Sequence, residues 1–229
     1  MSSPDFLPEP DPELIRKLEP MLEMLASDPA SLSSVTDLPS ATEVHLLDSL
    51  SATLLEELEN PEKVLDIGSG AGFPGIPLAA AMPETGFELI DSVGRKVEFI
   101  NRVIEKLGLK NARAIQTRSE DWASSKGREA YPVVTARAVA PLAQLAELAS
   151  PLLEEGGALI AWKGARESEG EGILKSAGSE IAMSLEKVVP VRPFAASRQR
   201  HLYVVRKTGP TPERLPRRPG MARKRPFTA

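Results

Sequence analysis

The sequence contains no cysteine among its 229 residues. This absence excludes disulfides, zinc–thiolate and iron–sulfur sites and any cysteine nucleophile. No apolar run approaches the roughly 18 residues that a membrane-spanning helix requires, and the first residues are acidic, so we expect neither a membrane span nor a secretory signal. Repeats are also absent. We expect a cytoplasmic protein that uses no metal and has no membrane partner.

Charge is distributed unevenly along the chain, although the net charge is only −4. Residues 1–60 hold 13 acidic and 2 basic residues, whereas residues 192–229 hold 11 basic and 1 acidic residue. A basic end of this kind is typical of phosphate contacts with a nucleic acid. A solubilising tail is the simpler alternative, because charge runs are often only solvated.

The stretch from 63 to 80 combines an apolar run, a glycine-rich turn and two prolines. Val64, Leu65 and Ile67 form a short apolar run that ends at glycines, which predicts a buried parallel strand entering a tight turn. Pro74 and Pro77 stand where the first turn of a helix tolerates proline, because the amide protons there lack intrahelical partners. The stretch therefore predicts a strand, a glycine loop and a helix.

A glycine loop followed by a helix suggests a nucleotide-bearing cofactor, since a ligand can approach the backbone closely and the helix offers free N–H groups. About 20 residues further on, a second apolar run ends in Asp91, where a ribose-binding carboxylate would stand. Asp66, just before the glycines, would oppose the pyrophosphate of a dinucleotide. The same carboxylate suits the ammonium and sulfonium cations of S-adenosylmethionine, which we favour.

Helical and strand patterns alternate along the rest of the chain. Amphipathic helices are predicted at 14–25, 41–58, 95–107 and 142–153, strands at 87–90, 112–117, 131–136, 157–162, 185–191 and 201–206, and a loop at 164–172. The alternation predicts an α/β fold with a mainly parallel, seven-stranded sheet and helices on both faces. Ligands of such folds lie outside the carboxyl ends of the strands.

The composition divides the chain into three expected parts. Residues 1–60 would be an N-terminal helical extension, of which the proline-rich, acidic residues 1–10 are expected to be disordered. Residues 61–208 would be the cofactor-binding domain, and residues 209–229 a basic tail. His45 and Asp48, three apart on one helical face, suggest a local hydrogen bond more than a catalytic pair.

Four segments together resemble a known family. Residues 64–79 read VLDIGSGAGFPGIPLA, Asp91-Ser92 follows, residues 135–142 read TARAVAPL, and Lys163-Gly164 comes later. These segments are similar to those of the RsmG family, also called GidB, the guanine-N7 methyltransferases of small-subunit ribosomal RNA. The resemblance implies a Rossmann-like class I methyltransferase that uses S-adenosylmethionine and methylates a guanine in the 530 loop of 16S rRNA, with rRNA or a small-subunit particle as partner.

The resemblance also implies roles for particular residues. Those expected to bind the cofactor are Gly68, Gly70, Phe73, Asp91, Ser119, Glu120 and Arg137. Those expected to contact RNA are Lys163, Arg198, Arg200, His201, Arg217, Arg218, Arg223, Lys224 and Arg225. For the charged residues, a surface ion pair is the simpler alternative. Phe73 could stack on a base, but packing in the core is the commoner role of a phenylalanine.

The expected chemistry agrees with what the chain lacks. Guanine N7 has an in-plane lone pair and loses no proton when it accepts a methyl group, so no catalytic base is expected. Catalysis would come from alignment and electrostatics. Two other classes stay open at this stage: a methyltransferase of small molecules, and a non-catalytic RNA-binding Rossmann protein. An NAD(P) oxidoreductase is disfavoured by Asp66 and by the family resemblance.

Overall fold

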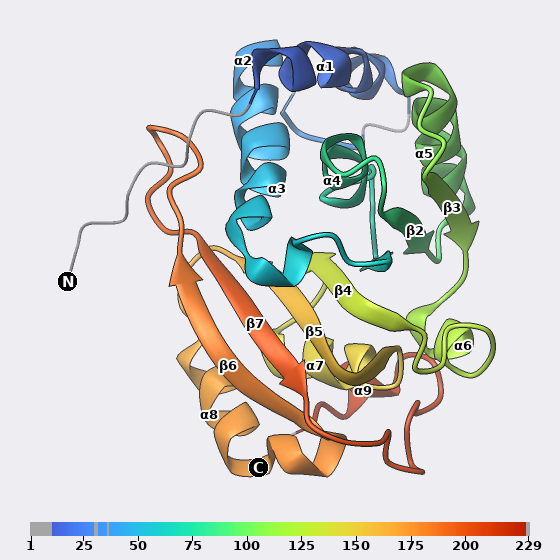
Figure 1. The fold of residues 1–229 in the computed structure, drawn as a ribbon, viewed down its shortest axis with the longest axis vertical. Helices are drawn as coiled ribbons and strands as arrows, with labels where there is room; N and C mark the ends of the chain where they lie inside the picture. Colours follow the sequence, from blue (N-terminus) through green and yellow to red (C-terminus); the bar gives the residue numbers. More distant parts are fainter. Residues whose placement is uncertain (1–10, 30–31, 36, 228–229) are drawn as a thin grey trace.

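The computed structural model describes residues 11–29, 32–35 and 37–227, arranged around one seven-stranded sheet (Figure 1). The strands are β1 (Lys63–Ile67), β2 (Gly86–Asp91), β3 (Ala112–Gln116), β4 (Tyr131–Arg137), β5 (Leu153–Lys163), β6 (Met183–Pro190) and β7 (His201–Lys207). Their order is β3-β2-β1-β4-β5-β7-β6, and β7 runs antiparallel to both of its neighbours. The predicted α/β fold is confirmed, while the expected disorder of residues 1–10 lies outside the described residues.

Side chains of the central strands alternate between two hydrophobic clusters, as the two-residue period of a strand requires. Val64 of β1 belongs to the cluster on one face of the sheet, and Leu65 to the cluster on the other. Both side chains are completely buried. A strand covered on both faces explains why this stretch reads as a continuous apolar run.

Helices cover both faces (Figure 1). On the first face lie α1 (Pro12–Ser27), α4 (Gly75–Ala81) and α5 (Gly94–Leu107), and on the second lie α6 (Ser119–Ala123), α7 (Leu142–Ala149) and α8 (Ser168–Ala177). The expected helix at 95–107 ends as predicted, because Gly108 takes the left-handed conformation with φ 63°. Helix α8 corrects the expected loop at 164–172, since Leu174 packs into the core despite the nearby glycines.

The expected helix at 41–58 is divided into shorter turns. They are α2 (Leu38–Ala41), the π-helix η1 (Thr42–Leu47), α3 (Asp48–Leu50), and the 3-10 turns η2 (Ser51–Leu54) and η3 (Glu56–Leu58). Hydroxyls of Ser49, Ser51 and Thr53 donate to backbone carbonyls three or four residues earlier. Such bonds compete with regular helical pairing and bend a helix. The segment still runs as one column beside the sheet (Figure 1).

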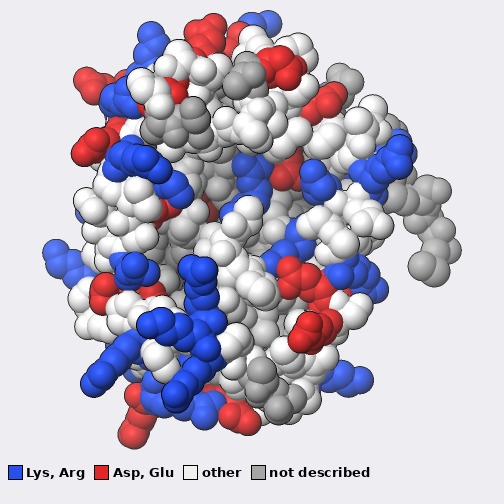
Figure 2. Space-filling model, turned by 180° about the vertical axis from the view of Figure 1, so that it is seen from behind, with Lys and Arg blue, Asp and Glu red and all other residues white. Residues whose placement is uncertain are grey.

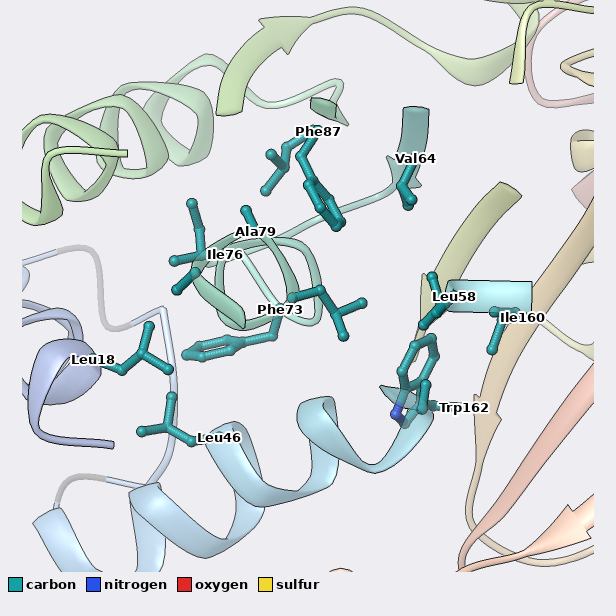
Figure 3. Packing of buried hydrophobic residues seen from close by; sticks show 14 of the residues in the cluster. Leu18, Leu46, Leu58, Val64, Phe73, Ile76, Ala79, Phe87, Ile160 and Trp162 are labelled. Carbon is teal, nitrogen blue, oxygen red and sulfur yellow. The ribbon is translucent and has the colours of Figure 1, made fainter. Parts of the chain in front are cut away.

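The N-terminal helices share the core of the sheet domain. Leu18 of α1 and Leu46 of η1 are fully buried in the same cluster as Phe73, whose ring points between them (Figure 3). The helices before residue 60 therefore close one face of the domain and have no separate core of their own. No helix in the described part of the chain is long and apolar enough to cross a membrane.

Two other segments differ from their expected form. Helix α7 ends at Ala149 instead of continuing to 153, because Pro151 disfavours helix just before it and Leu153 already pairs in β5. The expected basic tail is folded against the domain and includes the short helix α9 (Met221–Lys224). Leu215 and Ala222 in this segment are each only 3% exposed, so it packs as part of the protein. The 3-10 turn η4 (Gly178–Ile181) joins α8 to β6.

Candidate functional site

The glycine loop between β1 and α4 has the conformation that only glycine adopts readily. Gly68, Gly70 and Gly72 have φ of 64°, 61° and 95°. A Cβ at Gly68 would lie 2.7 Å from Cγ2 of Val139, which covers this glycine from the loop after β4. The loop therefore approaches a second loop closely, at the carboxyl ends of two neighbouring strands.

Asp91, at the end of β2, is tied to this glycine loop. Its Oδ2 accepts a hydrogen bond from the Gly70 amide at 3.1 Å, and its Oδ1 accepts one from the Val93 amide at 2.9 Å. Lys96 lies 3.5 Å from Oδ2. The carboxylate is held in one position and remains 6% exposed, at the wall of a cavity.

This first cavity, of about 500 Å³, opens at the carboxyl ends of β1, β2, β3 and β4. Its size is within the range of small-molecule and cofactor sites. Four of the seven residues expected to bind the cofactor line it together: Gly68, Asp91, Ser119 and Glu120. Gly220 and Arg223 of the C-terminal segment line it too, which the sequence did not indicate. We call it the donor cavity.

Glu120 joins the C-terminal segment to the donor cavity. Its Oε1 accepts a hydrogen bond from the Gly220 amide at 2.8 Å, and its Oε2 accepts one from the Ser119 hydroxyl at 3.2 Å. Nearby, Arg217 donates to both carboxylate oxygens of the buried Glu147, each at 2.6 Å. These bonds hold the segment as one wall of the donor cavity.

Asp66 is placed differently from what its charge suggested. The side chain is fully buried and does not line the donor cavity. Its Oδ1 accepts from the Thr135 hydroxyl at 2.9 Å, and its Oδ2 from the Gly75 amide at 3.2 Å. Burial raises the pKa of Asp66 to about 6. The carboxylate thus joins β1, β4 and the start of α4 underneath the glycine loop.

Phe73 and Arg137 also lie apart from the donor cavity. Phe73 is 6% exposed, stacks on the His45 ring with 4.7 Å between centroids, and has the Arg137 guanidinium 5.2 Å from its ring centroid. Phe73 therefore packs in the core, the commoner of the two roles considered from the sequence. Gly70 does not line the cavity either, and acts on it through its amide bond to Asp91.

Arg137 lines a second cavity of about 460 Å³, which we call the acceptor cavity. Its Nη1 lies 3.0 Å from Oδ2 of Asp48 and donates to the Val44 carbonyl at 3.2 Å. On the other side of the same carboxylate, Nε of Arg200 lies 3.3 Å from Oδ1. Burial lowers the pKa of Arg137, while the nearby Asp48 acts to raise it. One buried carboxylate therefore positions two arginines.

His45 and Asp48 do not form the local hydrogen bond that their spacing suggested. His45 Nε2 lies 2.9 Å from the Ser33 hydroxyl, and its buried Nδ1 has no hydrogen-bond partner among the residues that the structure describes. Burial, and then the charge of Arg137, lower the pKa of His45 to about 4. At neutral pH the ring is therefore uncharged.

The two cavities adjoin at Ala138, which lines both. Ala138 has φ 58°, an uncommon conformation for a residue with a side chain. Lys163 supports the same loop, because its Nζ donates to the Ala140 carbonyl at 2.5 Å and lies 2.6 Å from Glu167 Oε1. The Lys163 side chain is 9% exposed and lines the acceptor cavity, and its expected contact with RNA stays a prediction.

The remaining basic residues lie on the surface in two groups. Arg198, Arg200 and His201 line a third cavity beside the last two strands. Arg218, Arg223, Lys224 and Arg225 are exposed on the C-terminal segment, and Arg217 is half-buried against Glu147. On the face opposite to Figure 1, Lys and Arg side chains gather over the lower part of the molecule, where α9 lies (Figure 2).

One acidic cluster is the nearest approach to a metal site among residues 11–29, 32–35 and 37–227. Oxygens of Glu56, Glu57 and Glu186 lie within 4.8 Å of one another. Lys187 and Arg206 form ion pairs with these carboxylates, and both contact Glu57 Oε1, Lys187 at 2.9 Å and Arg206 at 2.8 Å. Two cations of the chain already compensate the charge there.

Comparisons with known proteins find relatives of this sequence over most of its length. A profile of the GidB family, described as rRNA small subunit methyltransferase G, matches residues 15–203. A protein of Pelotomaculum thermopropionicum named ribosomal RNA small subunit methyltransferase G is 40% identical over 199 residues, covering 86% of this chain and 83% of that protein. A protein of the same name from Geobacillus thermodenitrificans is 34% identical over 222 residues, covering 94% and 92% of the two chains.

Solved structures share the fold at low sequence identity. A SAM-dependent methyltransferase from Aquifex aeolicus matches with a TM-score of 0.54 and 19% identity, covering 86% of this chain and 99% of that one. TYW2 from Pyrococcus horikoshii, solved in complex with MeSAdo, matches with a TM-score of 0.53 and 14% identity, covering 69% and 60%. At these identities the likeness concerns the fold alone.

Proposed function

The chain belongs to the family of ribosomal RNA small subunit methyltransferase G, whose fold is that of S-adenosylmethionine-dependent methyltransferases, and from this membership we propose its reaction. The proposed reaction is transfer of a methyl group from S-adenosylmethionine to N7 of a guanine in 16S rRNA. The proposed substrate is the rRNA or a small-subunit particle. The proposed site of action is therefore the cytoplasm.

One observation carries the proposal: the donor and acceptor cavities adjoin at a single residue, Ala138. Methyl transfer needs the nucleophile and the methyl carbon in line and in contact, since alignment supplies much of the catalysis. Two separate cavities with a common wall at the carboxyl end of β4 are suited to hold the two reactants in this way.

The donor cavity fits S-adenosylmethionine in size and in polar groups. Asp91, fixed by the amides of Gly70 and Val93, offers a carboxylate to ribose hydroxyls. Gly68 exposes backbone at the wall, and Ser119 and Glu120 line the same cavity. When bound, S-adenosylmethionine supplies a methyl group on a sulfonium sulfur, which guanine N7 can accept without first losing a proton.

The acceptor cavity has the electrostatics that this reaction requires. No base is needed, and His45 is neutral above a pKa of about 4. Asp48 pairs with Arg137 and lies beside Arg200, so their positive charges are partly compensated next to a base that becomes cationic. We propose that Arg137 and Asp48 position the guanine and that Lys163 positions the loop between the two cavities.

The experiment supplies purified protein with methyl-labelled S-adenosylmethionine and small-subunit particles, then maps the label by nucleotide. The expected product is one N7-methylguanine in 16S rRNA. Asp91→Asn should lose donor affinity about tenfold in calorimetry with S-adenosylhomocysteine, because the amide removes a charged acceptor. The matched control is Glu84→Gln, at an exposed carboxylate away from both cavities. Label on another base, on protein or on a free metabolite contradicts the proposal.

A further inference from the structure

A third cavity, of about 620 Å³, lies beside the acceptor cavity. Four arginines and one histidine line it, together with no acidic residue: Arg166, Arg192, Arg198, Arg200 and His201. Arg200 lines the acceptor cavity as well, so the two cavities meet at this side chain. The order in the molecule is donor cavity, Ala138, acceptor cavity, Arg200 and third cavity.

The loop that carries three of these arginines is held by its own hydrogen bonds. The amide of Val191 donates to the Arg200 carbonyl at 2.9 Å and closes the loop at its base. Inside the loop, the buried Ser197 hydroxyl donates to the Phe194 carbonyl at 2.6 Å. His201 Nδ1 donates to the Gly164 carbonyl at 2.7 Å. The loop therefore holds these basic groups in place before a ligand binds, which reduces the entropy cost of binding.

The charges of the third cavity are only partly compensated by the chain. Arg166 binds both oxygens of Glu171, at 3.0 Å and 2.6 Å, and Arg200 lies beside Asp48. Arg198 is exposed and forms no ion pair with any residue of the described part of the chain. A concave surface that holds the uncompensated guanidinium group of Arg198 and no carboxylate in its wall attracts an anion, and guanidinium is suited to phosphate oxygens.

We infer that the third cavity binds the backbone phosphate next to the guanine that enters the acceptor cavity. This inference rests on the proposed function. Arg200 would connect the two subsites, with the base on one side of it and the phosphate on the other. A base that enters the acceptor cavity while its own phosphate lies in the third cavity must leave the stack, so the substrate is an unpaired or extruded nucleotide.

The C-terminal segment has a different part in this arrangement. Its Arg223 lines the donor cavity, its Arg218, Lys224 and Arg225 are exposed, and none of these residues lines the third cavity. These residues would contact phosphates further along the RNA. The third cavity would contact the one phosphate whose position is fixed relative to the reacting base.

The test combines a charge-removing variant with an RNA of altered backbone. Arg198→Gln removes the uncompensated charge, and Lys175→Gln, on the exposed face of α8, removes one surface charge elsewhere. Each full-length protein, loaded with S-adenosylhomocysteine, is titrated with an rRNA fragment at several salt concentrations. The slope of log affinity against log salt should fall in size by about 0.7 for Arg198→Gln and stay unchanged for Lys175→Gln.

A neutral methylphosphonate beside the methylated guanine identifies which phosphate is bound. It should weaken binding to the natural protein about threefold to tenfold and leave binding to Arg198→Gln nearly unchanged, because the two changes remove the same contact. Equal weakening of both proteins overturns the inference. The inference is also overturned if Arg198→Gln binds naked rRNA normally but no longer binds the small-subunit particle. That result would indicate that the cavity binds an acidic protein segment of the particle.

Failure of the proposed function gives a different result. If labelled methyl groups never reach a guanine of the particle, the proposed reaction is wrong and the phosphate subsite falls with it. If the guanine is methylated but the methylphosphonate has no effect that depends on Arg198, only the phosphate subsite is wrong.

Discussion

Replacing Lys163 by methionine tests the arrangement of the loop between the two cavities. The lysine side chain is 9% exposed, and its Nζ contacts the Ala140 carbonyl at 2.5 Å and Glu167 Oε1 at 2.6 Å. Glu167 uses its other oxygen to accept from the Leu142 amide at 2.7 Å. Methionine keeps the length of the side chain but leaves a carbonyl and a carboxylate without their cation.

The loss of stability expected for Lys163→Met follows from the burial of the lysine and its two partners. Leaving a buried acceptor unpaired costs about 1–3 kcal/mol, and breaking a buried ion pair costs about 3–5 kcal/mol. Glu167 is 29% exposed and can be partly rehydrated, so we expect a total near the lower ends of these ranges. We therefore predict that Lys163→Met lowers the free energy of unfolding by about 2–3 kcal/mol, equivalent to a fall of roughly 5–10 °C in Tm.

Urea unfolding followed by tryptophan fluorescence measures this loss, since Trp162 lines the acceptor cavity. A double-mutant cycle with Glu167→Gln should give a coupling energy of about 1–2 kcal/mol. The turnover number should fall more than the apparent affinity for RNA, because the displaced loop separates the two reactants. Unchanged stability together with a smaller salt dependence of RNA binding would refute this reasoning. That result would indicate that Lys163 contacts a phosphate.

Three further changes probe the donor side. Gly68→Ala should destabilise the protein by about 1–2 kcal/mol, because φ at this position is 64° and the new methyl group would lie 2.7 Å from Val139. Thermal unfolding measures this loss, and unchanged stability would contradict the loop geometry. The folded-state pKa of Asp66, about 6, exceeds its unfolded value. The stabilisation that the protonated side chain gives the folded state is therefore fully present near pH 4 and is lost as pH rises through 6. Urea titrations of Asp66→Asn should lack this loss. Arg217→Gln should cost about 1–2 kcal/mol by unpairing the buried Glu147 and should weaken S-adenosylhomocysteine binding in calorimetry, whereas unchanged donor affinity would separate the segment from the donor cavity.

The fold could be predicted from sequence because its signals are local. Each central strand is a short apolar run bounded by turns, and α5 shows both its helical period and its closing Gly108. Errors arose where tertiary packing overrides such signals. The glycines at 170 and 172 suggested a loop, but α8 forms because Leu174 reaches the core. The C-terminal segment was expected to be a basic tail because of its many charged residues, and its buried Leu215 and Ala222 gave no periodic signal.

Part of the donor cavity could also be predicted from local sequence signals. Gly68 and Asp91 lie at the ends of adjacent parallel strands, and the register that pairs Ile67 with Ile90 brings these ends together. Strand order was thus enough to place them in one cavity. It could not reveal Gly220 and Arg223, which reach that cavity only because Glu120 and Glu147 bind the C-terminal segment.

The acceptor side depends on contacts that no local pattern encodes. Asp48 contacts Arg137 and Arg200, which lie 89 and 152 residues further along the chain. Its spacing from His45 pointed instead to a local bond, since the sequence does not show that η1 and α3 turn Asp48 toward the sheet. A single carboxylate joins the N-terminal helices, the end of β4 and the basic loop before β7. The N-terminal helices therefore contribute to the wall of the acceptor cavity, because without them Arg137 and Arg200 would lack the carboxylate that they share.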